Sequence, residues 1–249
     1  LMDNIVNVTE YLHKKLSESG EDADRQCLSF LKAKDGKYYC FYEDKCWRIY
    51  KFIDKSYTIN YIKNRRFFEN AGKAFGRFQR NLSGYPMETL HETIKDFHNT
   101  PKRVEALEKS VAADVKSRAK LVSDEIKFAL DRKEDAKILI DLYHEGLIPL
   151  RVTHNDTKLN NVLFDEETNK AICIIDLDTI MPGFSLYDFG DAIRFAANFV
   201  AEDSPEYEKA GVDLNVFRCF AEGFLSKTAN TMTETELETL ALSAFVLTT

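Results

Sequence analysis

The segment from Val152 to Arg194 constrains the fold more than any other part of this 249-residue chain. Two short apolar runs within it, Val162–Phe164 and Ala171–Ile175, have the composition of strands, and the charged residues between them predict a turn. A hairpin brings the chain back to its starting end. The residue that enters the first strand and the residue that leaves the second are therefore expected about 5 Å apart.

Polar residues occupy those two positions. Asn161 enters the first strand, Asp176 follows the second, and His154 and Asp156 precede them in the spacing H-x-D-x-x-x-x-N. Amide and carboxylate oxygens suit Mg²⁺, which takes only one or two protein ligands. We therefore predict that Asn161 and Asp176 hold the metal, and that Asp156 orients an accepting hydroxyl and takes its proton in phosphoryl transfer. The alternative is an Asp that caps a turn and an Asn in a hairpin.

Asp188-Phe189-Gly190 spells the metal-binding D-F-G of protein kinases, but it follows Pro182-Gly183 rather than a strand. We expect Asp188 to accept hydrogen bonds from amides of the preceding loop, or to cap a helix that starts near Phe189. Lys158 could contact the transferring phosphate or lie in solvent.

Further polar residues follow the metal aspartate. Asp178 alternates with Asp176 along the expected strand, which makes it a candidate second metal ligand or sugar-hydroxyl ligand. Tyr187, Asp191 and Arg194 cluster just beyond and are candidates for binding the acceptor. The alternative for these residues is helix capping and surface pairing.

The motif that runs from His154 to Asn161, followed by Asp176, resembles the aminoglycoside phosphotransferase and choline kinase superfamily. The longer string HNDTKLNN…LYDFGDAIR, together with residues 72–79 and 91–103, resembles its N-acetylhexosamine 1-kinases. This resemblance implies a protein-kinase-like fold, ATP and Mg²⁺, and a sugar's anomeric hydroxyl as acceptor. It also implies that His154 packs beneath the loop, and that residues 91–103 lie near the acceptor.

Other functions fit the same residues. An aminoglycoside kinase would need an acidic acceptor pocket, and a choline kinase would need an aromatic cage, whereas Trp47 is the only tryptophan. A kinase-like scaffold without activity would not need Asp156, Asn161 and Asp176 together. A metal-dependent phosphohydrolase could use the same carboxylates without a glycine-rich loop.

The order of elements predicts a two-lobed α+β chain. Residues 1–53 are expected to form a truncated small lobe of one helix and antiparallel strands at 27–31, 38–42 and 47–53. The polar segments 34–37 and 43–45 separate these runs, and Asp35-Gly36 in the first segment is a strong tight-turn signal. No glycine-rich loop or phosphate-binding lysine of the kinase type occurs in the sequence. The cofactor contacts therefore remain unassigned, except for a hinge near Phe52 and Ile53. Residues 54–249 are expected to form a mostly helical large lobe.

Helical periodicity predicts the elements of that lobe. The expected helices span residues 57–82, 100–129, 133–144, 189–200, 212–228 and 234–247.

Composition excludes several classes of protein. The net charge of −7 gives no basic surface for nucleic acid or an anionic membrane. Five cysteines without C-x-x-C spacing predict reduced, structural thiols and a cytoplasmic protein. No apolar run approaches the length of a membrane-spanning helix.

Overall fold

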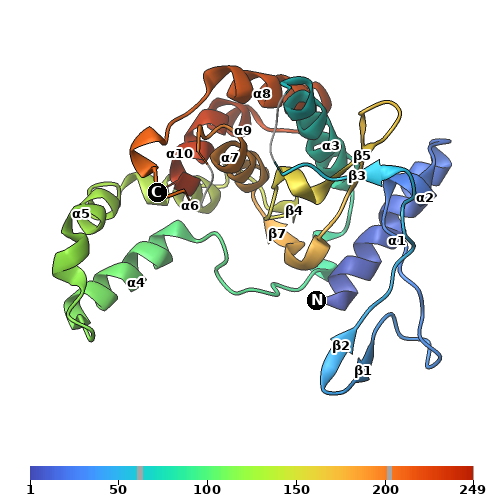
Figure 1. Ribbon diagram of the computed structural model, residues 1–249, viewed down its shortest axis with the longest axis horizontal. Helices are drawn as coiled ribbons and strands as arrows, with labels where there is room; N and C mark the ends of the chain where they lie inside the picture. Colours follow the sequence, from blue (N-terminus) through green and yellow to red (C-terminus); the bar gives the residue numbers. More distant parts are fainter. Residues whose placement is uncertain (61–63, 201–203, 249) are drawn as a thin grey trace.

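A three-stranded antiparallel sheet contains the predicted hairpin (Figure 1). This computed structural model describes residues 1–60, 64–200 and 204–248. Val162 lies opposite Ile174, and the register shifts by a bulge after Leu163. The strand that contains Ser56 pairs with the first strand of the hairpin, so that Ser56 lies opposite Asp165. The strands of this sheet are β3 (Ser56–Tyr57), β5 (Val162–Asp165) and β6 (Ala171–Ile174).

Most of the regular secondary structure around this sheet is α-helical (Figure 1). The bounds of the helices are α1 (Met2–Glu18), α2 (Ala23–Gln26), α3 (Arg66–Leu82), α4 (Thr100–Ala113), α5 (Ser123–Asp131), α6 (Ile138–His144), α7 (Ser185–Ala196), α8 (Leu214–Thr228), α9 (Glu234–Glu238) and α10 (Leu240–Thr248).

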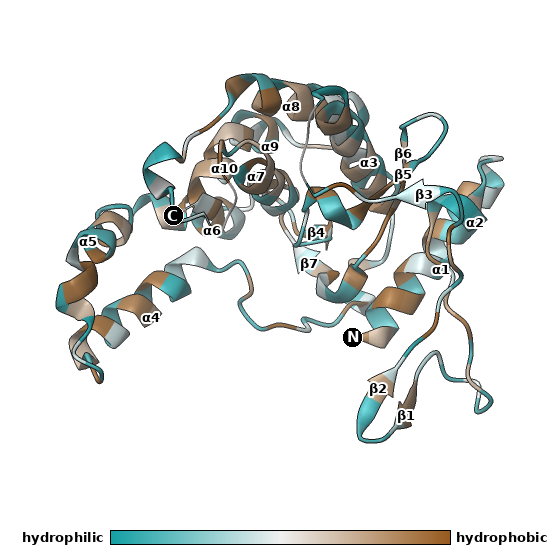
Figure 2. Cartoon of the chain, viewed as in Figure 1, coloured by the Kyte–Doolittle hydropathy of each residue, from teal (hydrophilic) through white to brown (hydrophobic). Residues whose placement is uncertain are grey.

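Helices α3 and α8 cross at glycines. A Cβ atom on Gly72 would lie 2.3 Å from the Phe220 carbonyl oxygen, and one on Gly223 would lie 2.2 Å from the Glu69 carbonyl oxygen. Only glycine allows two helix backbones to approach so closely. Apolar side chains of α3 pack on both α8 and β6, as the periodicity of this segment predicts. Figure 2 shows that hydrophobic and hydrophilic residues alternate along these helices.

A second small sheet was not predicted. β4 (Arg151–Thr153) pairs antiparallel with β7 (Met181–Gly183), so that Val152 lies opposite Pro182. β4 ends where the loop that carries Asp156 begins. Its first residue, Arg151, forms a bidentate ion pair with the buried carboxylate of Glu236 at the start of α9. Pairing with β7 along its whole length and the ion pair of its first residue fix β4, and hence the start of the loop.

The N-terminal strands are shorter than predicted. The hairpin consists of β1 (Cys40–Tyr42) and β2 (Lys45–Trp47), whereas the predicted strands at 27–31 and 47–53 meet only in an isolated bridge between Phe30 and Tyr50. Figure 1 shows the β1–β2 hairpin extending away from the helices. Its side chains are exposed, with Phe41 at 74% and Trp47 at 53%.

Several predicted helix boundaries are wrong. The helix expected from Tyr57 begins only at Arg66, because residues 56–57 join the sheet; residues 61–63 of that prediction lie outside the described part of the chain. The helix expected over 100–129 ends at Asp114, whose φ of 33° places it in the left-handed region. Helix α7 begins at Ser185, four residues before the expected start.

The break at Asp114 changes which residues are buried. Val115 lies just beyond the break and is 82% exposed, whereas Val104 on α4 is buried. Helices α4 and α5 form an arm that extends from the remaining helices (Figure 1).

One apolar cluster contains residues from both sides of the proposed boundary at residue 53. Ile5, Val8 and Leu12 of α1 belong to it together with Phe75 of α3 and Phe164 of β5. The division into residues 1–53 and 54–249 therefore remains a proposal about lobes that share a core. Among the described residues, no helix is long and apolar enough to cross a membrane.

Candidate active site

The mouth of the β5–β6 hairpin brings Asn161 beside the residue before Asp176. The Ile175 amide donates to the Asn161 carbonyl oxygen at 2.9 Å. Asp176 then adopts the left-handed conformation with φ 60°, which turns the chain out of the strand direction. Its side chain is exposed. The expected proximity of Asn161 and Asp176 along the backbone is present, and the meeting of their side-chain oxygens remains a prediction.

Asn161 also reaches back to Asp156. Its Nδ2 donates to the Asp156 carbonyl oxygen at 2.8 Å and to the Asp156 carboxylate at 3.1 Å. The Lys158 ammonium lies 3.2 Å from the other carboxylate oxygen of Asp156. The structure thus brings the predicted catalytic aspartate together with one predicted metal ligand and the predicted loop lysine.

The oxygen atoms that remain suit a hard cation. Within the described residues, none donates a hydrogen bond to Asn161 Oδ1 or to the Asp176 carboxylate. The same part of the chain contains no group of three His, Cys, Asp or Glu side chains placed to hold a metal ion. Mg²⁺ keeps several waters and needs only one or two protein oxygens, so this donor set fits Mg²⁺ rather than a fully protein-ligated metal.

His154 is fully buried beneath the loop. Its Nε2 lies 2.9 Å from the Ile175 carbonyl oxygen, and its Nδ1 accepts the Asp156 amide at 3.2 Å. A carbonyl oxygen only accepts, so Nε2 carries the proton and Nδ1 is the acceptor. The rings of Phe75 and Phe78 pack edge-on against the imidazole. Both ring nitrogens are occupied, and His154 joins the loop to β6, as the resemblance implies.

Asp188 is buried and binds loop amides, which was the first of its two predicted functions. Its carboxylate accepts from the amides of His154 at 3.1 Å and Asn155 at 2.8 Å, and from Gln79 at 2.7 Å. Burial raises the pKa of Asp188, and these donors together with His154 oppose the shift. Helix capping is excluded, because α7 begins three residues earlier at Ser185.

Asp191 lies one helical turn further along α7 and also holds the loop. It is 4% exposed and accepts the Thr157 amide at 2.8 Å. Arg194 neutralises its other oxygen at 3.0 Å. Asp188 and Asp191 therefore hold three loop amides on either side of Asp156, a pattern that the sequence analysis missed for Asp191. The i, i+3 spacing of the two acids on one helix was the available signal.

Two further predicted residues lie in unexpected surroundings. Asp178 does not share a strand face with Asp176, because residues Leu177–Thr179 form a 3₁₀ turn. Its carboxylate pairs with Arg48, which the sequence analysis did not consider. Tyr187 is buried, its ring packs between those of Phe184 and His98, and burial raises the pKa of its hydroxyl.

A pocket of about 430 Å³ lies between the α4–α5 arm, α7 and α10. Asp191 and Arg194 contribute to its wall, as do two residues from the polar 91–103 stretch, His98 and Arg103. Val104 and Leu107 of α4 supply apolar lining. Two of the four predicted acceptor residues thus share one pocket, whereas Tyr187 lines a neighbouring one and Asp178 lies at the metal turn.

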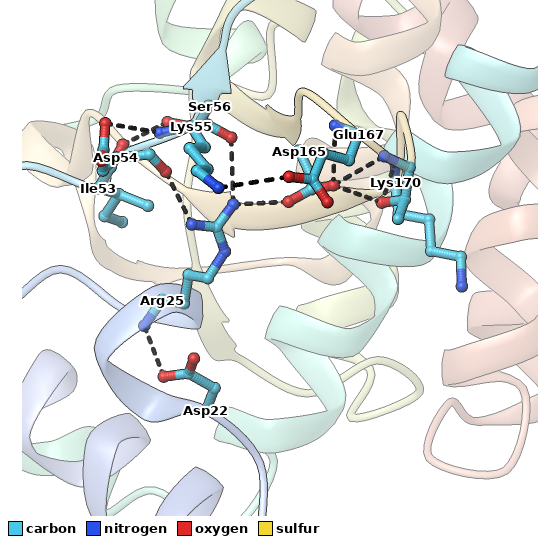
Figure 3. Close-up of polar contacts among 10 residues, drawn as sticks. Asp22, Arg25, Ile53, Asp54, Lys55, Ser56, Asp165, Glu167 and Lys170 are labelled. Carbon is cyan, nitrogen blue, oxygen red and sulfur yellow. Dashed lines mark hydrogen bonds and ion pairs between the residues drawn. The ribbon is translucent and has the colours of Figure 1, made fainter.

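The predicted hinge is held to the hairpin by Arg25. Its guanidinium donates to the carbonyl oxygens of Asp54 at 2.7 Å and Lys55 at 3.1 Å, and to the Asp165 carboxylate at 2.6 Å (Figure 3). Hydrogen bonds from Thr168 and this guanidinium lower the pKa of Asp165 to about 2. Phe52 is 84% exposed and Ile53 is buried, so only Phe52 presents a free surface at the hinge.

Comparison with known proteins adds to this geometry. Residues 66–220 match the model of a family described as "Phosphotransferase enzyme family" (APH). The fold resembles that of an amicoumacin kinase, hAmiN, whose structure was solved in complex with AMP-PNP, Ca²⁺ and Ami. The TM-score is 0.61 and the sequence identity is 12%, and the match covers 99% of this chain and 68% of the kinase chain. The fold also resembles that of a microcompartment-associated aminopropanol kinase at TM-score 0.52 and 15% identity, over 96% and 70% of the two chains. These likenesses confirm the kinase-like, two-lobed fold class.

Proposed function

Because this chain belongs to the phosphotransferase enzyme family, we propose that it transfers the γ-phosphoryl group of ATP to a hydroxyl of a small molecule. The observation that carries this proposal is the loop around Asp156. Buried acids of α7 hold the amides on both sides of it, and Asn161 holds its carbonyl. A rigidly placed carboxylate is what positioning of an acceptor hydroxyl needs.

Asp156 is the catalytic residue in this proposal. Its carboxylate accepts the proton of the attacking hydroxyl and directs that oxygen toward the phosphorus atom. Lys158, which lies 3.2 Å from this carboxylate, supplies a positive charge at the same place. His154 does not serve as the base, since both of its ring nitrogens are occupied by backbone partners.

Asn161 would hold Mg²⁺ through Oδ1 and Asp176 through its carboxylate, because no described residue donates a hydrogen bond to these oxygens. The ion would offset the negative charge of the triphosphate. Asp178 is held by Arg48, and so in this structure its charge is balanced by the protein itself. ATP binding would then involve the hinge near Phe52 and Ile53, which Arg25 and Asp165 attach to the hairpin.

The acceptor pocket in this proposal is the one lined by His98, Arg103, Asp191 and Arg194. Two guanidinium groups accompany a single carboxylate, which disfavours a polycationic aminoglycoside. Among the described residues, the lining contains no Phe, Tyr or Trp and so offers no aromatic cage for choline. Trp47 lies on the exposed β1–β2 hairpin. Donors and an acceptor beside apolar groups suit a neutral sugar. We therefore propose an N-acetylhexosamine, phosphorylated at its anomeric hydroxyl, in a cytoplasmic reaction.

The test measures ADP release with ATP and Mg²⁺ in the presence of N-acetylhexosamines, choline and kanamycin in parallel. We expect turnover on the sugars and a sugar 1-phosphate as product. Turnover on kanamycin or choline alone would replace the acceptor but keep the phosphotransfer. Phosphate release without any acceptor would favour a phosphohydrolase, and an absence of turnover together with metal-independent partner binding would favour a scaffold.

A further inference from the structure

His98 contacts the loop of Asp156 from a distant segment of the chain. Its Nε2 lies 2.9 Å from the carbonyl oxygen of Asn155, the residue directly before Asp156. Asn155 adopts the left-handed conformation, with φ 66°. This conformation is uncommon for a residue other than glycine and persists only where neighbouring groups stabilise it.

The other polar groups of Asn155 are fixed by nearby elements. Its amide donates to Asp188 at 2.8 Å, and its side-chain Nδ2 donates to the Thr179 carbonyl oxygen at 3.0 Å. Its Oδ1 accepts from the Thr153 hydroxyl at 3.0 Å. The backbone carbonyl of Asn155 differs from these groups, because its partner among the described residues is His98, in the polar stretch 91–103.

The chemistry of this contact defines the imidazole. A carbonyl oxygen only accepts, so Nε2 must carry a proton, in the neutral ring as well as in the charged one. The His98 ring packs against Phe97 and Tyr187, with centroids 4.5 and 5.1 Å away. Burial lowers the pKa of His98; the nearby carboxylates of Asp188 and Asp191 oppose the shift, whereas Arg103 reinforces it. The neutral Nε2–H form is therefore the one present at neutral pH.

His98 is also joined to the wall of the acceptor pocket. Helix α4 begins two residues later, and Asn99 caps it by accepting the Lys102 amide. The Arg103 guanidinium, which lines the pocket, donates to the carbonyl oxygen of Phe97. The His98 ring itself lines the same pocket. One side chain therefore touches both the pocket and the backbone that precedes Asp156.

We propose that His98 is a positioning residue for phosphotransfer, which holds the Asn155 carbonyl so that the Asp156 carboxylate faces the acceptor bound between α4, α7 and α10. This inference rests on the proposed function and deepens it by linking the acceptor pocket to the catalytic loop. His98 exchanges no proton with the substrate. Its contribution is the orientation of the loop, so only its hydrogen-bond donor is required.

The test compares His98→Phe, His98→Gln and the control His13→Gln. Phenylalanine keeps the ring packing and removes the donor, whereas glutamine supplies an amide N–H at a similar reach. His13 lies on α1, pairs with Asp24 at the surface and serves as the matched control. For His98→Phe we expect kcat to fall about 10- to 100-fold, as misplacement of a catalytic group does, with the KM for ATP unchanged. We expect His98→Gln to recover most of kcat.

Two results would overturn the inference. One is wild-type kcat in a folded His98→Phe variant. The other is an equal loss in the Gln and Phe variants, which would make the imidazole itself catalytic. Nitrogen NMR of wild-type His98 provides a readout that needs neither a variant nor turnover. A protonated Nε2 is expected at pH 7, and an unprotonated Nε2 excludes the contact. If the wild-type protein shows no phosphotransfer but its NMR spectrum shows the protonated Nε2, the proposed function is rejected, whereas the hydrogen bond between His98 and Asn155 is confirmed.

Discussion

Two residues with positive φ lie on either side of the candidate site. Asn155 (φ 66°) precedes Asp156, and Asp176 (φ 60°) follows β6. Asn and Asp adopt the left-handed conformation more readily than other side chains, because their short polar groups bond locally. At Asn155 those bonds are present on every side. At Asp176 the carboxylate stays exposed without a described partner, which is consistent with a residue reserved for a ligand.

The function of Asp156 is tested by replacement with asparagine. Asparagine still offers an oxygen to Asn161 Nδ2, so the loop should keep its conformation, but it cannot accept a proton. We expect kcat to fall by about 10²–10⁴, the usual contribution of a general base, and nucleotide affinity to stay near that of the wild type. Steady-state kinetics and calorimetry measure the two quantities. Turnover near the wild-type rate would remove Asp156 from the mechanism.

At the scale of elements, local signals predicted what local forces determine. The β5–β6 hairpin followed from two apolar runs around a charged turn, and the apolar stripe of α3 followed from helical spacing. The β4–β7 pair joins Val152 to Pro182, which are 30 residues apart in the sequence, and the whole β5–β6 hairpin lies between the two strands, so no single connecting turn marks the pairing. The end of α4 at Asp114 could not be predicted either, because nothing in the sequence distinguishes an aspartate in the left-handed conformation from one inside a helix.

At the close crossing of α3 and α8, we expect a glycine-to-alanine change to destabilise the protein, although helix propensity alone predicts that it stabilises the helix. Alanine in place of glycine inside a helix ordinarily stabilises it by about 1 kcal/mol. At Gly72 the added Cβ would lie 2.3 Å from the Phe220 carbonyl oxygen, so the helices must separate. We expect Gly72→Ala to lower the free energy of unfolding by about 1–3 kcal/mol, the usual cost of overpacking.

Urea denaturation measures this change. Arg80→Ala, at an exposed position of the same helix, is the matched control and should leave the free energy of unfolding within about 0.5 kcal/mol of the wild type. A Gly72→Ala variant more stable than the wild type would mean that the two helices do not pack as closely as described.

At the scale of the whole molecule, the site depends on side chains from remote parts of the sequence. Gln79 of α3 binds Asp188, His98 binds Asn155, and Arg48 binds Asp178. Gln79, His98 and Arg48 lie outside the H-x-D-x-x-x-x-N motif and far from it in the sequence. Sequence reasoning therefore identified the residues whose chemistry is specific, such as Asp156. The residues that orient them become visible only when the chain is folded.

The attachment of the N-terminal part to the hairpin gives a pH-dependent prediction. The Asp165 carboxylate accepts a hydrogen bond from the Thr168 hydroxyl. It also accepts one from Arg25, which in addition donates to the carbonyl oxygens of Asp54 and Lys55 (Figure 3). These donors lower its pKa from 3.8 to about 2. A carboxyl with a depressed folded-state pKa stabilises the protein fully above its ordinary pKa, and this stabilisation is lost as the pH falls toward the folded value. The window for Asp165 is therefore about pH 4 to pH 2.

We expect the thermal midpoint of the wild type to fall more steeply across that window than the midpoint of Asp165→Asn, because asparagine has no proton to take up. Asp141→Asn, at an exposed carboxylate on α6, should keep the wild-type slope. Scanning calorimetry at half-unit steps of pH between 5 and 2 measures the three slopes. Identical slopes in Asp165→Asn and the wild type would show that Arg25 does not hold the hinge through this carboxylate. The hinge would then depend on the backbone hydrogen bonds of residues 54 and 55 alone.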